Sequence, residues 1–288
     1  MTTQATKFNP DAYKTTTREQ WESAAQAWND WSGLLKKWLG PATDQMLDMA
    51  NVKRGSHVLD VAAGAGEQTL VVAEKVGPYG SVLATDISPS ILTFAAQNAR
   101  DAGYKNVTAR ELDGEALFEL EPHSFDAVVS RVGLIYFPDQ QKALAGMKHV
   151  LKPGGKVAAM VYSTPDKNAF FSVPVSIIRR RAQLPPPLPG QPGPFSLGGE
   201  DVLEQAFVQA GFKNIEVVRV NAPVQLKTAH DCLRFEQESF GALHQMLGGL
   251  SEDEQKDAWQ EIHEALCKFE INGRFEGPCE MLIAVGTN

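Results

Sequence analysis

The stretch Val58-Leu-Asp-Val-Ala-Ala-Gly-Ala-Gly-Glu-Gln-Thr-Leu70 predicts a buried strand, a glycine-rich turn and the start of a helix. Its first four residues carry the short apolar run of a central parallel strand. Gly64 and Gly66 lack a Cβ atom where a ligand must come close to the backbone. The unpaired N–H groups at the start of the next helix suit an anionic group. The stretch therefore predicts a binding site for a nucleotide-like ligand.

Two residues argue against a nicotinamide dinucleotide at this turn. Its fingerprint is G-x-G-x-x-G, and Thr69 stands where the third glycine is expected. Asp60 ends the strand, and a carboxylate is a poor neighbour for a pyrophosphate but accepts a ligand with a cationic amino-acid end. A nicotinamide-dependent oxidoreductase is therefore kept only as the alternative.

The next strand also ends in an acid, in Val82-Leu-Ala-Thr-Asp86. A carboxylate about twenty residues after a glycine turn is where such folds hold ribose hydroxyls. Ser88 and Pro89 supply the N-cap and the first position of the helix that follows. Because Ser88 already caps that helix, Asp86 is available for a ligand.

Three further pieces follow in order. A third strand ends in Asp113-Gly114, a fourth covers Phe125–Ser130, and the turn Leu151-Lys-Pro-Gly-Gly155 precedes a fifth. Together with D-x-A-x-G-x-G at Asp60–Gly66, they resemble class I S-adenosylmethionine-dependent methyltransferases. More narrowly, the chain resembles the ubiquinone/menaquinone-biosynthesis type of small-molecule methyltransferase. The resemblance is strong over residues 50–165 and weaker towards the C-terminus.

The resemblance implies an α/β fold: a doubly wound, Rossmann-like sheet of seven strands, with a helical cap and an N-terminal helical arm. It also implies S-adenosylmethionine as the cofactor. One departure is Ala62, which stands where the commonest pattern has its first glycine. The implied cofactor contacts are Asp60, Ala62, Gly64 and Gly66 around the methionine moiety, Thr69 bonded to that end, Asp86 on the ribose, Ile87 on the adenine, Asp113 and Gly114 at the adenine edge, and Ser130 and Arg131 beneath the sulfonium.

The implied reaction is methyl transfer to a small, apolar or aromatic acceptor, on O, C or N. Aromatic walls stabilise the cationic methyl through their π faces, and the candidates for the substrate pocket are Trp28, Tyr136, Phe137 and Phe195. Tyr136 and His230 are the candidate catalytic residues. A non-catalytic protein that binds S-adenosylmethionine is a second alternative. The sequence does not identify the acceptor, the methylated atom, a general base or the oligomeric state.

Regions outside the core are expected to set the acceptor. Residues 1–45 form the arm, in which the capping box Thr17-Arg-Glu-Gln20 predicts a helix start. Tryptophans follow at helical spacing and indicate a lid or a packed helix. The core covers 46–165, and a proline-rich lid segment covers 166–200.

The C-terminal part, residues 201–288, completes the core sheet. A helical cap is expected at 221–277, inserted between the last two strands, Asn214–Val220 and Glu280–Val285. A second capping box, Ser251-Glu-Asp-Glu254, predicts a helix start inside it.

Composition limits the remaining possibilities. The chain has 288 residues and a formal net charge of −8, which opposes binding to nucleic acid. No apolar run is long enough to cross a bilayer, and no signal sequence opens the chain. Three cysteines without metal-ligand spacing indicate reduced thiols, no metal and a cytoplasmic protein. The expected partner is the small-molecule acceptor alone.

Overall fold

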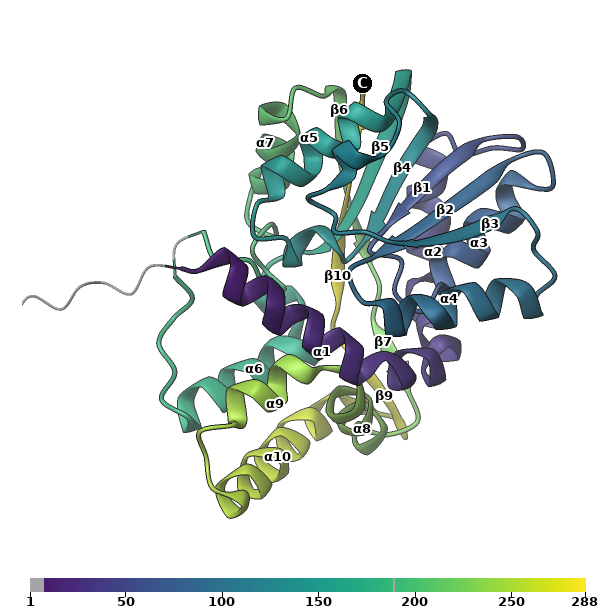
Figure 1. Cartoon of the computed structure of the whole chain (residues 1–288). Helices are drawn as coiled ribbons and strands as arrows, with labels where there is room; N and C mark the ends of the chain where they lie inside the picture. The colour runs from purple at the N-terminus through teal and green to yellow at the C-terminus, as the bar shows by residue number, and fades with distance from the viewer. Residues whose placement is uncertain (1–7, 189) are drawn as a thin grey trace, which may run out of the picture.

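The computed structural model describes residues 8–188 and 190–288, and a seven-stranded sheet forms its centre (Figure 1). The strand order is β3-β2-β1-β4-β5-β10-β6. Strands β1 to β5 are parallel, whereas β10 is antiparallel to both β5 and β6. The sheet strands are β1 His57–Val61, β2 Ser81–Asp86, β3 Val107–Glu111, β4 Phe125–Arg131, β5 Leu151–Tyr162, β6 Lys213–Asn221 and β10 Glu280–Thr287. The predicted doubly wound α/β fold is confirmed.

Helices cover both faces of this sheet (Figure 1). On one face α2 packs against α3, and on the other α5 packs against α7. Because β1 is covered on both faces, its residues from Val58 to Val61 are fully buried, as the apolar run predicts. The helices are α1 Pro10–Asp30, α2 Ser32–Met49, α3 Glu67–Val76, α4 Pro89–Asp101, α5 Gln140–Val150, α6 Ala169–Arg181, α7 Val202–Gln209, α8 Ala229–Ser239, α9 Gly241–Leu247 and α10 Glu252–Leu266.

The turn Leu151-Lys-Pro-Gly-Gly155 is part of β5 rather than a loop before it. Phe125 pairs with Leu151, but Ala127 pairs with Lys156, so the strand takes up the extra residues as a bulge. A bulge of this kind bends the strand and ends the regular ladder. It allows β5 to start directly after α5.

The arm helix begins earlier than the capping box predicts. α1 starts at Pro10, with the Asn9 side chain accepting the Ala12 N–H at 3.1 Å. Thr17 lies two turns inside the helix, so the prediction of a start at Thr17 is wrong. Asn9 supplies an N-cap and Pro10 the first helical position. The helix therefore starts there rather than at Thr17, because no residue between Pro10 and Thr17 interrupts it.

The cap lies between β6 and β10 and contains α8, α9 and α10. The capping box at Ser251 and Glu254 is confirmed, with both reciprocal hydrogen bonds present. The segment also carries a small sheet of order β7-β9-β8, which the sequence analysis did not predict. Its strands are β7 Val224–Leu226, β8 Glu270–Ile271 and β9 Arg274–Gly277.

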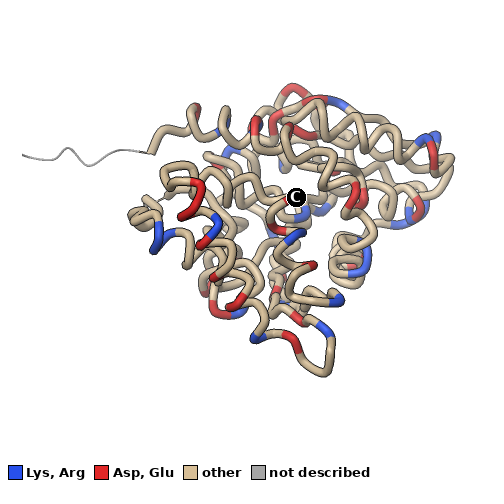
Figure 2. Tube along the Cα trace, turned by 90° about the horizontal axis from the view of Figure 1, so that it is seen from below, with Lys and Arg blue, Asp and Glu red and all other residues tan. Residues whose placement is uncertain are grey.

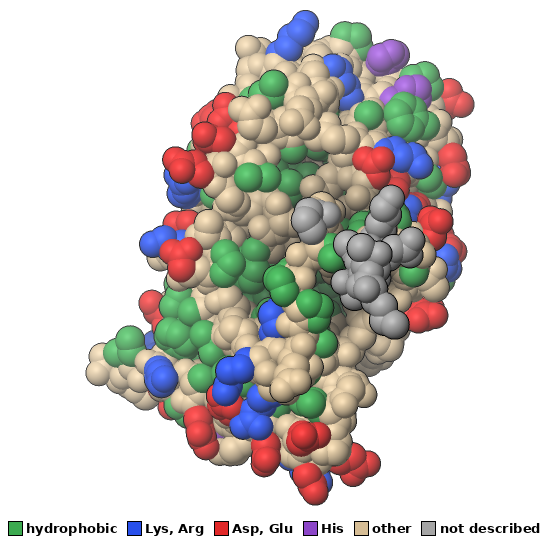
Figure 3. Space-filling model, turned by 90° about the vertical axis from the view of Figure 1, so that its left-hand side faces the viewer, with side chains coloured by type: hydrophobic (Ala, Val, Ile, Leu, Met, Phe, Trp, Pro, Cys, Tyr) green, Lys and Arg blue, Asp and Glu red, His purple; other side chains and the backbone are tan. Residues whose placement is uncertain are grey.

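Helix α1 runs between the core and the cap, contacting α4 on one side and α8 and α9 on the other (Figure 1). Lysines and arginines are interspersed with acidic residues in the view from the cap side (Figure 2). On the face shown in Figure 3, hydrophobic side chains gather around a hollow between core and cap. In the described ranges, no helix combines the length and the apolar character that crossing a bilayer requires.

Candidate active site

A cavity lies at the carboxyl ends of β1, β2 and β4, where ligands bind in open α/β sheets. The core side of its wall comes from the glycine turn after β1 and from the loops after β2, β3 and β4. The opposite side comes from α1, α2 and Phe240 at the end of α8. Core and added segments therefore enclose one shared space. The predicted site residues that line it are Ala62, Gly64, Asp86, Ile87, Asp113, Gly114, Arg131, Trp28, Tyr136 and Phe137.

The two glycines of the turn differ in what surrounds them. Gly64 has φ +58°, and a Cβ atom there would meet only Ile91 Cδ1, at 3.9 Å, so its free side faces the cavity. At Gly66, φ is +88° and a Cβ would lie 2.7 Å from the Cα of Ala95. Gly66 is therefore required by the packing of the turn on α4, and it does not line the cavity.

Two non-glycine residues beside the cavity have left-handed backbone angles. Ala62, where the common pattern has glycine, has φ +57°, and Val132 has φ +62°. A β-branched residue such as valine rarely adopts this region. Both residues line the cavity, so backbone strain is concentrated at this site.

Asp60 is fully buried behind the turn and does not line the cavity. The side chains of Gln68 and Thr69 donate hydrogen bonds to its carboxylate, at 2.6 and 2.7 Å. Burial raises the pKa of Asp60 to about 6, although these two bonds and Arg131 lower it. Thr69 therefore acts on Asp60 in this structure, and Asp60 places a buried negative charge behind the cavity wall.

Asp86 is buried at the end of β2 and organises the turn next to it. Its carboxylate accepts the backbone N–H of Gly64 and of Ser88, each at 3.0 Å. Ser88 caps α4 through the N–H of Ile91, as predicted. Burial raises the pKa of Asp86, opposed by the backbone bonds. Asp86 thus ties the loop after β2 to the glycine turn, with its carboxylate at the cavity wall.

Asp113 lies at the cavity wall but is already bound by a lysine of α1. Lys14 Nζ is 2.6 Å from Asp113 Oδ2. Gly114 packs under Phe137, because a Cβ there would lie 2.4 Å from the Phe137 ring. Glycine at 114 therefore lets the loop after β3 approach the segment after β4.

Arg131 lines the cavity in a buried ion pair with Glu67, at 2.6 Å. Its guanidinium also donates to Thr43 Oγ1 of α2, at 3.0 Å. Glu67 opens α3, so this pair connects the glycine turn, β4 and the arm. The neighbouring Ser130 is buried with no hydrogen-bond partner for its hydroxyl and does not line the cavity.

Four aromatic rings form an aromatic wall of the cavity. The Trp21 ring lies 5.4 Å from the Tyr136 ring and 5.5 Å from the Trp28 ring, and Trp28 lies 5.6 Å from Phe240. All four line the cavity. Burial raises the pKa of Tyr136 above its ordinary value, so its phenol stays protonated. Tyr136 can donate or accept a hydrogen bond there, but it cannot act as a phenolate base at neutral pH.

Two further predicted residues, Phe195 and His230, also lie outside the cavity wall in the part of the chain that the structure describes. Phe195 packs behind the wall, 6.2 Å from the Tyr162 ring. His230 is exposed on α8, with its ring 5.8 Å from that of His263. This placement does not support a catalytic role for His230.

Several residues of the site were missed by sequence reasoning. They include Lys14 and Trp38 from the arm, Glu67 and Gln68 from the first turn of α3, and Tyr162 at the end of β5. Helical spacing could have found Lys14, because Lys14, Thr17, Trp21 and Trp28 recur on one face of α1. No group of three or more His, Cys, Asp or Glu in the described residues is placed to hold a metal ion.

The fold is similar to that of solved structures, a methyltransferase among them. The YcgJ protein of Bacillus subtilis aligns with a TM-score of 0.57 at 20% identity, over 86% of this chain and 98% of that one. Phosphoethanolamine N-methyltransferase 2 of Haemonchus contortus, solved with S-adenosylhomocysteine, gives 0.56 at 18% identity, over 90% and 57%. The fold is that of S-adenosylmethionine-dependent methyltransferases.

Sequence comparison narrows the class to a family. The ubiE/COQ5 methyltransferase family matches residues 34–177, and this chain belongs to it. The ubiquinone/menaquinone biosynthesis C-methyltransferase of Pasteurella multocida is 30% identical over 194 residues, 62% of this chain and 70% of the relative. The demethylmenaquinone methyltransferase of Shouchella clausii is 30% identical over 195 residues, 63% and 79%. The protein is an S-adenosylmethionine-dependent methyltransferase, and the nicotinamide alternative is not favoured.

The cavity fits this cofactor. The open side of Gly64 leaves room that a side chain would fill. The carboxylate of Asp86 at the wall is suited to ribose hydroxyls, and the buried negative charge of Asp60 is suited to a cationic methionine end. When bound, S-adenosylmethionine supplies the electrophilic methyl group.

Proposed function

We propose that the cavity binds S-adenosylmethionine with its methionine end at Gly64 and Arg131 and its ribose at Asp86. In this arrangement Ile87 packs on the adenine, and the Asp113 carboxylate accepts a hydrogen bond from the adenine amino group. The support is that all five residues line the same cavity. Asp60, Gly66 and Thr69 act indirectly by shaping the turn.

We further propose that the acceptor is a small aromatic compound methylated at a ring carbon. The observation that carries this is the cluster of aromatic rings in the cavity lining, made by Trp21, Trp28, Tyr136 and Phe240. Flat apolar walls suit an aromatic ring, and their π faces favour the cationic character of the transferred methyl. The relatives' names, C-methyltransferases of quinone biosynthesis, point to the same acceptor chemistry.

The chain's own part in the reaction is alignment and exclusion of water. Aligning the acceptor carbon with the methyl and the sulfur supplies roughly 7–11 kcal/mol of the barrier in favourable cases. The arm and the cap close the cavity from the side opposite the core. Tyr136, which stays protonated, can hold a hydroxyl of the acceptor beside the reacting carbon.

The acceptor class is tested with tritiated S-adenosylmethionine and three acceptor groups: quinols with a free ring position, simple phenols and small amines. We expect label on a ring carbon of the quinol group, located by NMR of the product. Label on nitrogen, or on a phenol oxygen only, contradicts the proposed carbon chemistry while leaving methyl transfer intact.

A further inference from the structure

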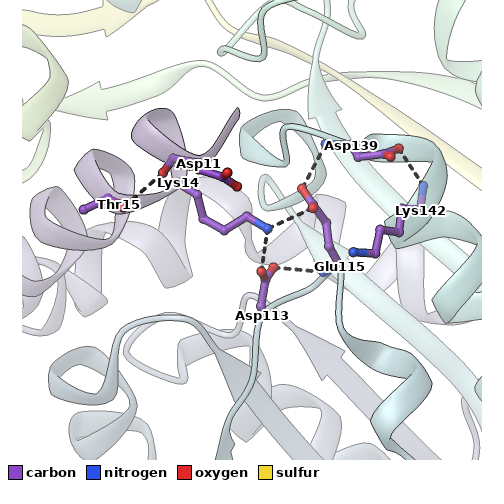
Figure 4. Close-up of polar contacts among 7 residues, drawn as sticks. All are labelled: Asp11, Lys14, Thr15, Asp113, Glu115, Asp139 and Lys142. Atoms are coloured by element: carbon purple, nitrogen blue, oxygen red, sulfur yellow. Dashed lines mark hydrogen bonds and ion pairs between the residues drawn. The ribbon is translucent and has the colours of Figure 1, made fainter. Parts of the chain in front are cut away.

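A single lysine of α1 connects the arm to the core at the cavity edge. Lys14 Nζ lies 2.6 Å from Asp113 Oδ2 and 2.8 Å from Glu115 Oε2 (Figure 4). Lys14 itself lines the cavity next to Asp113. One ammonium group therefore bridges a helix near the N-terminus and the loop after β3, about a hundred residues away in the chain.

The network continues from Lys14 into the segment before α5 (Figure 4). Glu115 Oε1 accepts the backbone N–H of Asp139 at 2.9 Å. Asp139 Oδ1 in turn accepts the N–H of Lys142 and caps α5. Tyr136, Phe137 and Pro138, which all line the cavity, immediately precede Asp139 in the chain. The bridge thus reaches both the proposed cofactor wall and the aromatic wall.

Because this network is partly buried, its carboxylates depend on the positive charge of Lys14. The Glu115 side chain is only 7% exposed and the Lys14 side chain 27%. A buried carboxylate without a cationic partner is costly, and here two carboxylates share one cation. Burial lowers the pKa of Lys14, but its bonds to Asp113 and Glu115 outweigh this and raise the pKa, so the ammonium stays charged.

We propose that Lys14 is a positioning residue for α1: its ion pairs hold this helix closed over the cavity and so set how fast the cofactor enters and leaves. The proposal rests on the proposed function of the cavity, and in particular on Asp113 facing the adenine. Trp21 and Trp28 line the cavity from the same helix, so in this proposal α1 moves when the cofactor enters or leaves. Breaking the Lys14 bridge removes a contact of the closed state and so speeds both entry and exit.

The test uses S-adenosylhomocysteine as the probe and the intrinsic tryptophan fluorescence of the full chain as the signal, in stopped-flow mixing. Three of its five tryptophans, Trp21, Trp28 and Trp38, line the cavity. For Lys14→Met we expect dissociation about tenfold faster, equivalent to about 1.4 kcal/mol, with association also faster. The equilibrium affinity then changes less than the dissociation rate does. Lys14→Arg, which keeps the charge, should restore dissociation to near the wild-type rate.

Arg18→Met is the matched control. Arg18 lies one turn further along α1 and pairs with Glu111 at 2.7 Å, in a more exposed position. It removes an arm-to-core ion pair without touching Asp113 or Glu115, so both rates should stay at wild-type values. Circular dichroism confirms that each variant is folded.

Three results overturn the proposal. They are wild-type rates in Lys14→Met, equal acceleration in Arg18→Met, or an affinity loss caused by slower association alone. If Lys14→Met does not fold, unchanged dissociation in Lys14→Gln overturns it instead. Failure of the wild-type protein to bind S-adenosylhomocysteine is a different result, because it contradicts the proposed function of the cavity.

Discussion

Gly64 is the residue at which a side chain and a ligand would compete for the same space. Gly64→Val should lower S-adenosylmethionine affinity at least tenfold, because a branched Cβ would project into the cavity. Gly103→Val is the control, since Gly103 has φ +78° and nothing within 4 Å of a Cβ but lies away from the cavity. It carries similar backbone strain and should leave affinity unchanged. Calorimetric titration of both variants decides the matter, and near-normal binding by Gly64→Val would remove this turn from the site.

The buried carboxyl group of Asp60 makes the stability of the fold depend on pH. Its pKa is raised to about 6 in the fold, so the folded state favours the protonated acid. Stability is therefore lost as the pH rises from about 4 to about 6, and the loss is complete above that range. At pH 7 the unfolding free energy of Asp60→Asn should exceed that of the wild type by a difference on the order of 2 kcal/mol. At pH 4 the two unfolding free energies should be similar. Urea unfolding at both pH values measures the difference, and an equal difference at the two would contradict the raised pKa.

At the scale of elements, the sequence predicted strands and turns better than the arm. The alternation of buried strands with capped helices is local, so β1, β2 and the Ser88 cap follow from short stretches. The start of α1 was misplaced because Thr17 satisfies a capping pattern that the longer helix overrides. Because Lys14 lies before the predicted helix start, it was not predicted to belong to this helix or to line the cavity. The β7-β9-β8 sheet was missed because its strands have two to four residues, too short for a periodic signal.

Trp28 links two of these elements, α1 and α8. Its indole N–H donates to the backbone oxygen of the buried Ser239, at 2.9 Å. Trp28→Phe keeps an aromatic ring but leaves that oxygen without its donor, and should lower the unfolding free energy by about 1–3 kcal/mol. Trp31→Phe is the matched control, because Trp31 donates to the exposed Glu238 carboxylate, which water can satisfy instead. Chemical unfolding of both variants tests this, and equal losses would show that ring size rather than the buried bond matters.

In the whole molecule, the cavity is lined partly by the core and partly by the added segments. The sequence predicts the core part of the lining well, but it does not predict the part that the added segments contribute. The glycine turn and the acids at Asp60, Asp86 and Asp113 lie within the part that resembles known methyltransferases. The aromatic wall joins residues of α1, the segment after β4 and the end of α8, which meet only in three dimensions. No local sequence pattern shows which side chains such distant segments bring together. Of the predicted residues Tyr136, Phe195 and His230, only Tyr136 lines the cavity.

This division predicts separate effects on binding and on rate. Removing residues 1–31, and with them α1, should leave cofactor affinity within about an order of magnitude but reduce methyl transfer far more. The reason is that α1 lines the cavity and, in our proposal, aligns its contents, whereas the proposed cofactor contacts come mainly from the core. Titration and single-turnover transfer to a quinol acceptor, with folding checked by circular dichroism, give the two quantities. Equal losses in both would mean that the arm builds the cofactor site itself.

The most direct test of the central claim is a crystal structure of the full chain with S-adenosylhomocysteine. We expect the ligand to lie in the cavity, in contact with both the glycine turn and the aromatic wall. Its ribose hydroxyls should bond to Asp86, its adenine should pack on Ile87 beside Asp113, and its sulfur should face Tyr136 and Trp21. A ligand bound elsewhere on the molecule, or in this cavity with its adenine at the aromatic wall, would contradict the assignment of the two walls.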